Sequence, residues 1–364
     1  MPSMQAAARV VNTSATPVGV ALPAERVLAV DDLSVRFATS ERTVDAVRQL
    51  SFHVDRGETL AIVGESGSGK SVTSLALMRL VEWGGGHILQ GRMDFRRRNG
   101  EVLDLAHASN AAMRAIRGAD IAMIFQEPMT SLNPVFTAGD QIAEAIRLHR
   151  QVTRAQAAER AVGLLEQVRM PSPAARAGDY PHQLSGGMRQ RAMIAIALAC
   201  EPDLLIADEP TTALDVTTQA QILALLKRLQ AETGMAMLLI THDLGVVAET
   251  ADRAAVMYAG RIVEHGDVGG LLSHPTHPYT AGLLASLAIE ALPPGARLPE
   301  IPGTVPPLSA MPPGCAFAPR CAHALPRCRT EIPTLRSEGG RQTACHAPLS
   351  LPVRSIPVLE EVAA

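Results

Sequence analysis

Short apolar runs, separated by glycine, proline and charged residues, dominate the first hundred positions. Runs of this length that are rich in Val, Leu, Ile and Phe are typical of β-strands. They predict strands at residues 27–30, 33–37, 50–54, 59–63 and 87–95. The charged stretch Arg96–Gly100 is predicted to be a solvent-facing hairpin turn. The opening of the chain is therefore expected to be mainly β.

From residue 138 to about 169 the apolar positions change to helical spacing. Two stripes recur at intervals of three or four residues: Ile142, Ala145, Ile146 and His149, then Ala161, Leu164, Leu165 and Val168. This all-helical insert stands between β segments. The pattern therefore predicts a domain with two lobes, the helical one at about residues 127–184.

Strand-like and helix-like segments alternate through the following hundred residues. The pattern predicts strands at 121–125, 204–209, 235–240, 254–258 and 261–264, and helices at 186–200 and 219–233. Such alternation indicates an α/β fold built on a largely parallel sheet.

Composition fits a folded protein of one large domain or two ordinary ones. The 364 residues are 47% apolar and 19% charged, and the net charge of −3 argues against general nucleic-acid binding. The apolar stretch at 192–200 is about half of the roughly 20 residues that a bilayer span needs, so we expect no membrane crossing by this chain. Residues 1–24 carry no secretory pattern and are predicted to be a disordered tail in the cytoplasm.

The motif G-x-x-x-x-G-K-[ST] occurs without a mismatch at Gly64–Ser71. A strand, a glycine-rich turn and a helix start direct successive backbone N–H groups toward an anion such as a nucleotide's phosphates. Lys70 would reach the outer phosphates, and the Ser71 hydroxyl would ligate Mg²⁺. A turn that binds nothing does not account for eight matching positions in this context. The predicted nucleotide-binding residues here are Gly64, Glu65, Ser66, Gly67, Ser68, Gly69, Lys70, Ser71 and Val72.

Two adjacent carboxylates, Asp208 and Glu209, end the apolar strand that begins at Leu204. Because side chains alternate along a strand, the two point different ways and can do different jobs. One can hold Mg²⁺ through water while the other acts on a nucleophilic water. A carboxylate that caps the next helix would explain one of them but hardly both. His242 follows another strand, and it lies at the same sheet edge as the phosphate loop if the sheet is parallel.

Two further features each have two interpretations. Ser185 is placed to cap a helix whose first residues, Gly186 and Gly187, leave backbone N–H groups uncovered; this is either a second anion site or an ordinary capped helix. Phe37, one of six Phe, lies upstream of the phosphate loop and either stacks on an adenine or packs in the core.

The composition shifts after about residue 291. Fourteen of the 26 prolines lie between Pro293 and Pro357, which predicts an irregular extension over 291–364 without long helices or strands. Four thiols in a loop-rich segment favour a metal over disulfides in a cytoplasmic protein. The gaps between them are five, six and sixteen residues, not the two-residue spacing of common zinc sites, so a [4Fe–4S] cluster, zinc and free thiols all remain open. The candidate ligands are Cys315, Cys321, Cys328 and Cys345.

Taken in order, these motifs resemble the nucleotide-binding subunit of an ATP-binding cassette (ABC) transporter over roughly residues 25–290. The family order is Walker A, Q-loop, signature, Walker B, D-loop and H-loop. In this sequence it corresponds to Gly64–Ser71, Gln126, Leu184–Met188, Leu204–Glu209, Ala213–Asp215 and His242. The resemblance implies a P-loop NTPase fold with a RecA-like core, an antiparallel β subdomain and an α-helical subdomain.

The resemblance also implies roles for individual residues. Glu209 is similar to the general base, His242 to the γ-phosphate sensor, and Gln126 and Asp208 to ligands of magnesium and water. The signature residues Ser185, Gly186 and Gly187 would cap an ATP held by an opposing subunit. Met188 departs from the usual Gln, although peptide permeases commonly have Met at this position.

Three further stretches narrow the resemblance to the oligopeptide/dipeptide/nickel permease family: Gln126–Pro134, Tyr180–Gln183 and His277–Leu284. Within that family the chain resembles the D-type subunit at Gly64–Gly69 and at Ala251–Arg253 with Met257–Gly260. The resemblance implies a heterodimer with an F-type ATPase, two integral membrane permease subunits and an extracytoplasmic solute-binding protein. It also implies a [4Fe–4S] cluster in the extension, as in some members, and a place at the cytoplasmic face of the cell membrane.

Together these features predict a magnesium-dependent ATPase that drives uptake of di- and oligopeptides. The same machinery importing nickel, glutathione or another small solute is the alternative. A non-transport ABC ATPase would need a long coiled coil or two cassettes, and the sequence shows one cassette and no heptad run. A redox protein built on the cysteines has no substrate-pocket motif to support it.

Overall fold

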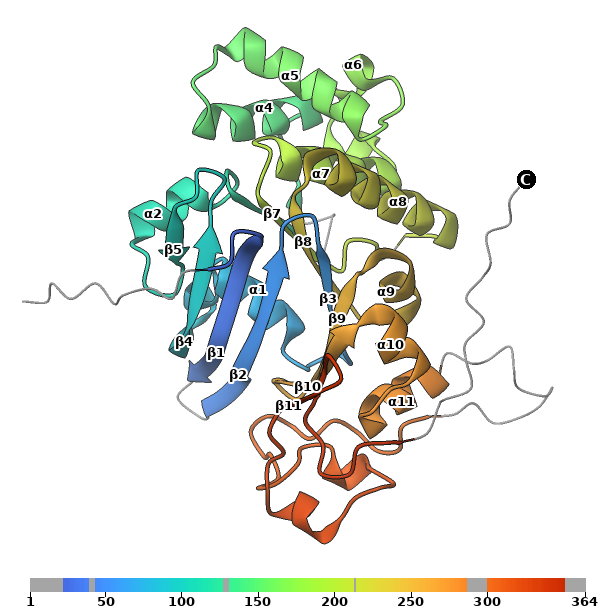
Figure 1. The fold of residues 1–364 in the computed structure, drawn as a ribbon. Coiled ribbons are helices and arrows are strands. Elements are labelled where there is room, and N and C mark those ends of the chain that lie inside the picture. The colour runs from blue at the N-terminus through green and yellow to red at the C-terminus, as the bar shows by residue number, and fades with distance from the viewer. Residues whose placement is uncertain (1–21, 39–42, 127–130, 213, 287–299, 351–364) are drawn as a thin grey trace, which may run out of the picture.

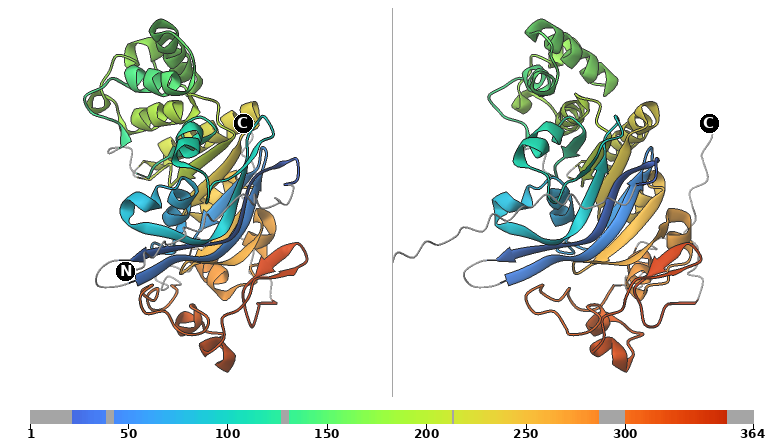
Figure 2. Two further views of the ribbon diagram at one scale, coloured as in Figure 1. Left: turned by 90° about the vertical axis from the view of Figure 1, so that its left-hand side faces the viewer. Right: turned by 60° about the vertical axis from the view of Figure 1, so that its left-hand side comes forward.

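The computed structural model describes residues 22–38, 43–126, 131–212, 214–286 and 300–350. Most of the predicted tail at 1–24, the predicted boundary near 290, residues 127–130 of the Gln126–Pro134 stretch and Ala213 lie outside the described residues. Two sheets occupy the middle of the molecule, with a helical lobe at one end and the C-terminal extension at the other (Figure 1). Two further views keep this order (Figure 2).

The first sheet is antiparallel, with strand order β2-β1-β4-β5. Its strands are β1 (Arg26–Ala38), β2 (Thr43–Asp55), β4 (Gly86–Arg96) and β5 (Val102–Asp104). The pattern predicted two separate strands within β1, but the strand is continuous because a bulge absorbs the polar pair between them. Asp32 has φ of 53°, and the register shifts between Val30 and Leu33. The side chains of Val30 and Leu33 therefore both remain buried.

The second sheet is the core of the molecule, with strand order β11-β12-β10-β9-β3-β8-β7-β6. Neighbours from β9 to β6 are parallel, whereas β10 is antiparallel to β9. Strands buried on both faces read as continuous apolar runs, which is why their positions could be predicted. The bounds are β3 (Thr59–Val63), β6 (Ile121–Ile124), β7 (Leu204–Asp208), β8 (Ala236–Thr241), β9 (Arg253–Tyr258) and β10 (Arg261–Asp267).

Helices follow the strands of this sheet, and most begin at a side-chain cap. Asp215 accepts a hydrogen bond from the backbone N–H of Thr218, and Asp243 accepts from Gly245 and Val246. The helices of this part are α1 (Lys70–Leu77), α2 (Asn110–Ile116), α7 (Gly186–Leu198), α8 (Val216–Thr233), α9 (Leu244–Thr250), α10 (Val268–Ser273) and α11 (Pro278–Ala285). Short 3₁₀ turns span Val81–Gly84 and Pro181–Gln183.

The predicted helical insert is confirmed as a separate lobe. The long helical stretch is divided into α4 (Ala138–His149) and α5 (Arg154–Gln167), followed by the short α6 (Pro173–Arg176). Thr153 divides them because it forms a capping box with Gln156 at the start of α5. Apolar residues of α4, α5, α7 and α8 share one buried cluster, which joins the lobe to the sheet.

The extension is fixed to the sheet rather than hanging from it. Two short strands, β11 (Arg336–Glu338) and β12 (Arg341–Thr343), continue the sheet beyond β10, and composition alone did not predict them. Glu264 of β10 is fully buried and accepts hydrogen bonds from the backbone N–H groups of Thr276 and His277 at 2.6 and 3.0 Å. In the described part of the extension, residues 300–350, the remaining regular pieces are 3₁₀ turns at Ala318–Arg320 and Pro326–Arg329.

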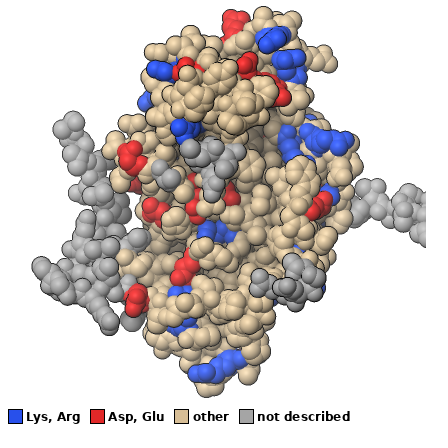
Figure 3. Space-filling view, turned by 180° about the vertical axis from the view of Figure 1, so that it is seen from behind, with Lys and Arg blue, Asp and Glu red and all other residues tan. Residues whose placement is uncertain are grey.

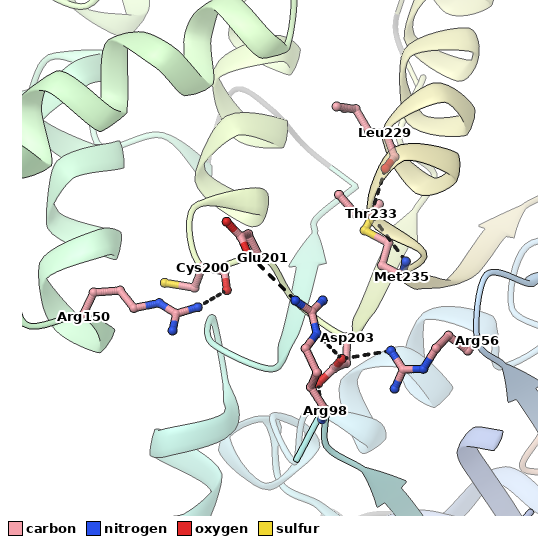
Figure 4. A network of polar contacts seen from close by, with 9 residues as sticks. All are labelled: Arg56, Arg98, Arg150, Cys200, Glu201, Asp203, Leu229, Thr233 and Met235. Carbon is pink, nitrogen blue, oxygen red and sulfur yellow. Dashed lines mark hydrogen bonds and ion pairs between the residues drawn. The ribbon is translucent and has the colours of Figure 1, made fainter. Parts of the chain in front are cut away.

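A buried carboxylate connects the two sheets (Figure 4). Asp203, 3% exposed, precedes β7 and accepts hydrogen bonds from Arg98 in the β4–β5 turn, through the backbone N–H at 2.8 Å and Nε at 3.1 Å. Arg56, from the turn between β2 and β3, approaches the same carboxylate at 3.2 Å. The charged turn predicted to be solvated therefore also holds the sheets together.

Charged side chains on the rear face lie interspersed rather than sorted by sign (Figure 3). Lys and Arg form several separate groups there, and Asp and Glu lie between them. No helix among the described residues is long and apolar enough to cross a membrane.

Candidate functional site

The glycine-rich turn at Gly64–Gly69 joins the end of β3 to the start of α1. Two of its glycines, Gly64 and Gly69, are needed because the backbone of other segments comes very close. A Cβ on Gly64 would lie 2.2 Å from the carbonyl oxygen of Met257, and one on Gly69 would lie 2.5 Å from that of Ala46. Gly69 also has φ of 102°, which favours glycine. The turn is thus packed tightly against β2 and β9, which fixes its shape.

Lys70 folds back over this turn. Its Nζ donates to the carbonyl oxygens of Gly64 at 2.7 Å and Glu65 at 3.1 Å. Burial lowers the pKa of Lys70, while the carboxylates of Glu209, Asp208 and Glu65 oppose that shift. The ammonium group therefore lies at the centre of the loop, where an incoming anion would meet it.

Asp208 is nearly buried at the end of β7 and faces α1. Its carboxylate accepts hydrogen bonds from Ser71 Oγ at 3.2 Å and Ser74 Oγ at 3.1 Å. Burial raises the pKa of Asp208, and the two hydroxyls work in the opposite direction. A serine hydroxyl beside a carboxylate is an oxygen donor set of the kind that Mg²⁺ prefers.

Glu209 points away from Asp208 and is held by three other side chains. Its carboxylate accepts from Gln126 Nε2 at 3.0 Å and Thr212 Oγ1 at 2.9 Å, and lies 3.1 Å from His242 Nδ1. The residue has φ of 47°, and its backbone N–H donates to the carbonyl of Ile240 at 2.8 Å. Burial alone would raise the pKa of Glu209, but the contacts with His242, Thr212 and Gln126 together lower it.

The structure thus brings Gln126, Glu209 and His242 into one group and Asp208, Ser71 and Lys70 into a neighbouring one. His242 and Gln126 are exposed, so the group faces solvent. Carboxylates of different environment, an imidazole and an amide at the edge of a parallel sheet can orient a water molecule beside an anion held by the loop. The arrangement can support hydrolysis of a bound phosphate ester or anhydride.

The segment at Ser185–Gly187 lies apart from these two groups. Ser185 caps α7, with Oγ accepting from the backbone N–H of Met188 at 3.3 Å. A Cβ on Gly187 would lie 2.8 Å from a methyl carbon of Thr218, so the glycine lets α7 and α8 meet. The cap and the exposed Gly186 agree with either interpretation of this helix start.

Phe37 packs beside the start of β4. It is paired with Gly86, and a Cβ on Gly86 would lie 2.8 Å from the phenyl ring. The ring is partly buried against the core cluster, and Val72 is packed against the same cluster. The core interpretation of Phe37 therefore has direct contacts behind it, while stacking on a base stays a prediction.

Several residues at the site were not singled out from the sequence. Ser74 could have been found, since it lies three positions after Ser71 on the same face of α1. Thr212 lies three positions after Glu209, but nothing marks it as a partner. Tyr279 and Arg320 contact Glu65 of the loop from 214 and 255 positions away, and no local signal predicts such contacts.

The four cysteines of the extension gather in one neighbourhood. Burial raises the pKa of Cys345 to about 11, with the charges of Cys315, Cys321 and Cys328 adding to the shift. Among the described residues, however, no group of three or more His, Cys, Asp or Glu could hold a metal ion. The sulfur atoms of Cys328 and Cys345 instead accept from nearby backbone N–H groups, both at 3.4 Å. The predicted cluster site is therefore not supported by this arrangement.

Two family models match the chain. The ABC transporter model matches residues 47–212, and the model of the oligopeptide/dipeptide transporter C-terminal region matches residues 263–328. The phosphate loop, Gln126, Asp208 and Glu209 fall in the first matched segment, and Tyr279 and Arg320 fall in the second, whereas His242 lies between the two.

Relatives with long alignments are named for import. A protein of Brucella melitensis biotype 1, named as a peptide import ATP-binding protein, is 56% identical over 316 residues, covering 85% of this chain and 94% of the relative. The glutathione import ATP-binding protein GsiA of Pectobacterium atrosepticum is 62% identical over 269 residues, covering 74% of this chain but 43% of the relative.

Solved structures with the same fold include a dimeric ATP-binding cassette in a post-hydrolysis state with ADP and Pi bound. It has a TM-score of 0.58 and 26% identity, covering 66% of this chain and 98% of that one. A subunit of the ABC transporter complex cbiONQ from Clostridium perfringens gives a TM-score of 0.56 at 25% identity, covering 68% and 90%.

Replacing Gly64 with alanine tests the tight packing of the turn. The new Cβ would have to displace the Met257 carbonyl, so we expect Gly64→Ala to lower the free energy of unfolding by about 1–3 kcal/mol in chemical denaturation. Gly163 in α5 has no atom within 4 Å of an added Cβ and is the matched control. Gly163→Ala should leave the protein unchanged or stabilise it by up to about 1 kcal/mol. Equal stability of Gly64→Ala and the wild type would contradict the packing argument.

The pKa of Glu209 can be measured directly, by carbon-13 NMR titration of its carboxyl group. In the native protein this pKa is lowered. The contacts of the ionised carboxylate therefore stabilise the folded protein at pH values above the usual pKa of a carboxyl group. That stabilisation is lost as the pH falls through the native pKa of Glu209. His242→Ala removes the strongest lowering contact and should raise the Glu209 pKa. His107→Ala, which removes a histidine beside Asp104, should leave it unchanged. An unaltered titration in His242→Ala would show that the contact does not act on Glu209.

Proposed function

This chain belongs to the ABC transporter family of ATP-binding subunits, and we propose that it hydrolyses ATP to drive the import of peptides across a membrane. The predicted fold class, an α/β nucleotide-binding cassette with antiparallel β and helical parts, is confirmed by the sheets, the helical lobe and the likeness to solved cassettes. The observation that carries the proposal is the convergence of Gln126, Glu209 and His242 next to the phosphate loop. The similarity of this chain to peptide import proteins supports peptides as the class of transported solute.

In the proposed site the loop amides from Ser66 to Ser71 and the positive end of α1 cradle the phosphates of ATP. Lys70 exchanges its two carbonyl partners for phosphate oxygens. Ser71 and Asp208 already share a hydrogen bond, and with Gln126 they would hold Mg²⁺, which neutralises phosphate charge. Stacking of Phe37 on the adenine stays a prediction, made from the position of this ring upstream of the phosphate loop.

Hydrolysis is assigned to Glu209. Its lowered pKa keeps the carboxylate ionised, as a base must be, and Gln126 and His242 fix its direction. The water to be activated would lie between this carboxylate and the terminal phosphate on the loop. His242, being exposed, can exchange its contact with Glu209 for a phosphate oxygen.

The signature segment serves a second nucleotide in this proposal. Ser185, Gly186 and Gly187 present an exposed helix start, and a helix N-terminus of this kind binds anionic groups. Two cassettes would therefore enclose two ATP molecules, each held by the phosphate loop of one subunit and the signature of the other. A dimeric relative with ADP and Pi bound supports this arrangement.

The proposed partners are those that the family resemblance implies. We propose a second, F-type ATPase subunit, two integral membrane permease subunits and an extracytoplasmic solute-binding protein, with this chain at the cytoplasmic face of the membrane. ATP-driven closure of the two cassettes supplies the conformational work, and hydrolysis reopens them.

Glutathione is the second candidate solute, because GsiA of Pectobacterium atrosepticum matches 74% of the chain at 62% identity. Glutathione is itself a small peptide, so the ATPase site is the same in both readings. The transporter isolated from solubilised membranes through this subunit would decide between them. Its solute-binding protein should bind di- and oligopeptides more tightly than glutathione, and the reverse order would favour the glutathione alternative.

The catalytic assignment predicts a specific loss. Glu209→Gln should reduce ATPase turnover of the assembled transporter by roughly 10²- to 10⁴-fold, because an amide cannot accept the proton of water. ATP binding should persist, since the phosphate loop is untouched. Glu249→Gln, at an exposed carboxylate of α9, is the control and should keep wild-type turnover. Full activity of Glu209→Gln would refute the assignment of the base.

A metal bound by Cys315, Cys321, Cys328 and Cys345 is a separate proposal that rests on four thiols in a loop-rich segment and on the family resemblance, since no described group of three such residues is placed to hold an ion. Ligation by all four would require their sulfur atoms to turn from their present partners toward one centre. Protein purified without oxygen should contain about four iron atoms and four acid-labile sulfides per chain if a [4Fe–4S] cluster forms. Zinc without iron would indicate a structural zinc site. The absence of both metals would indicate that the four cysteines are free thiols. Cys200→Ser, at a buried cysteine outside the extension, should not change the metal content.

A further inference from the structure

The C-terminal extension contacts the phosphate loop directly. Arg320, in the 3₁₀ turn at Ala318–Arg320, forms a two-point ion pair with Glu65, the second residue of the loop. Its Nη1 lies 2.7 Å from Oε2 and its Nη2 lies 3.1 Å from Oε1. The Arg320 side chain is only 4% exposed and that of Glu65 is 30% exposed, so solvent screens this pair less than a fully exposed one.

Arg320 is itself held in place from the extension. Its Nε donates to the carbonyl of Pro302 at 3.0 Å, and its Nη2 to that of Ile301 at 3.3 Å. The guanidinium also lies over the Tyr258 ring, 5.9 Å from its centre. The planar group is therefore fixed before it meets the carboxylate of Glu65.

Tyr279 holds the backbone of the same loop residue. The Glu65 N–H donates to the Tyr279 hydroxyl at 2.9 Å. Tyr279 is fully buried and packs against the rings of Tyr258 and Phe317. Its own backbone N–H donates to the side chain of His277, which caps α11, at 3.0 Å. Because burial raises the pKa of Tyr279, the phenol stays protonated.

All three polar parts of Glu65 are thus committed: its N–H to Tyr279, its carboxylate to Arg320 and its carbonyl to Lys70. The loop positions that follow, Ser66 and Gly67, are exposed. Because these three contacts fix Glu65, they also fix the direction of the backbone N–H groups that follow it in the loop. Fixing a binding loop before its ligand arrives removes an ordering cost that binding would otherwise bear.

We propose that Arg320 of the extension and Tyr279 of α11 are positioning residues of the nucleotide site, which hold the phosphate loop in its ATP-binding conformation through Glu65. The proposal rests on the ATP binding proposed above. It assigns the extension a part in ATP affinity that acts through the contact of Arg320 with Glu65.

Thermodynamic linkage gives the proposal a second consequence. If docking of the extension favours ATP binding, ATP binding must favour docking by the same factor. The backbone N–H groups of Cys315 and Arg320 are hydrogen-bonded within the docked extension. Their exchange with solvent should therefore slow when ATP binds, at a distance from the nucleotide itself.

The test is MgATP affinity of the full chain, measured by titration calorimetry under conditions without turnover. Arg320→Gln leaves the Glu65 carboxylate without its charged partner and should weaken MgATP binding about tenfold. Tyr279→Phe keeps the ring packed, removes one hydrogen bond and should give a smaller loss. Arg329→Gln removes an exposed arginine of the same extension and should bind MgATP as the wild type does.

Two further measurements separate this role from a general loss of stability. Glu65→Gln combined with Arg320→Gln should cost no more affinity than Arg320→Gln alone, because the two residues act as one unit. Hydrogen exchange of residues 314–330 in the wild type should slow with MgATP, and Arg320→Gln should lose that response. If Arg320→Gln does not fold, Tyr279→Phe and the wild-type exchange decide the matter.

Unchanged MgATP affinity in Arg320→Gln and Tyr279→Phe, or exchange in 314–330 that ignores MgATP, would overturn this inference while leaving the proposed ATPase intact. A wild-type chain that binds no MgATP would overturn both.

Discussion

The register of three parallel strands is the constraint on which the site depends. Val63 at the end of β3 pairs with Thr241 of β8, and Asp208 at the end of β7 pairs with Ile240 of the same strand. The carboxyl ends of the three strands therefore meet at one edge, and the residues that follow them converge. A slip of one residue in β7 would turn Asp208 away from Ser71 and destroy the pairing on which the site is built.

Glu209 reaches this edge of the sheet in a strained backbone conformation that its contacts maintain. The strand ends at Asp208, and the next residue turns into a left-handed conformation that costs roughly 1 kcal/mol for a residue with a side chain. Its N–H bond to Ile240 and the three side chains around its carboxylate hold it there. Backbone strain at a residue with a lowered pKa and convergent partners is a pattern found at functional sites.

The sequence was informative where a local pattern has one structural solution. Apolar runs buried on both faces, a phosphate-loop motif and helical stripes such as that of α5 each specify an element, and those elements are present. Two partners of Glu209, Gln126 and His242, were found because each follows a strand, whereas the third, Thr212, was not. Three kinds of fact were not accessible: the bulge at Asp32, the pairing of β12 with β10, and the contacts of Glu65 with Tyr279 and Arg320. Each depends on contacts between distant segments, which no window of sequence contains.

The contacts of Glu65 also change how the boundary of the cassette is understood. Composition separates the proline-rich extension from the α/β part, whereas packing does not: Tyr258 of β9, Tyr279 of α11 and Phe317 form one buried aromatic cluster. Aromatic packing of this kind is rigid, because rings at these distances have few alternative arrangements. Arg320 follows Phe317 by a single turn and carries that rigidity to the phosphate loop. The phosphate loop is therefore supported from both sides, by the sheet that precedes it and by the 3₁₀ turn of the extension that carries Arg320.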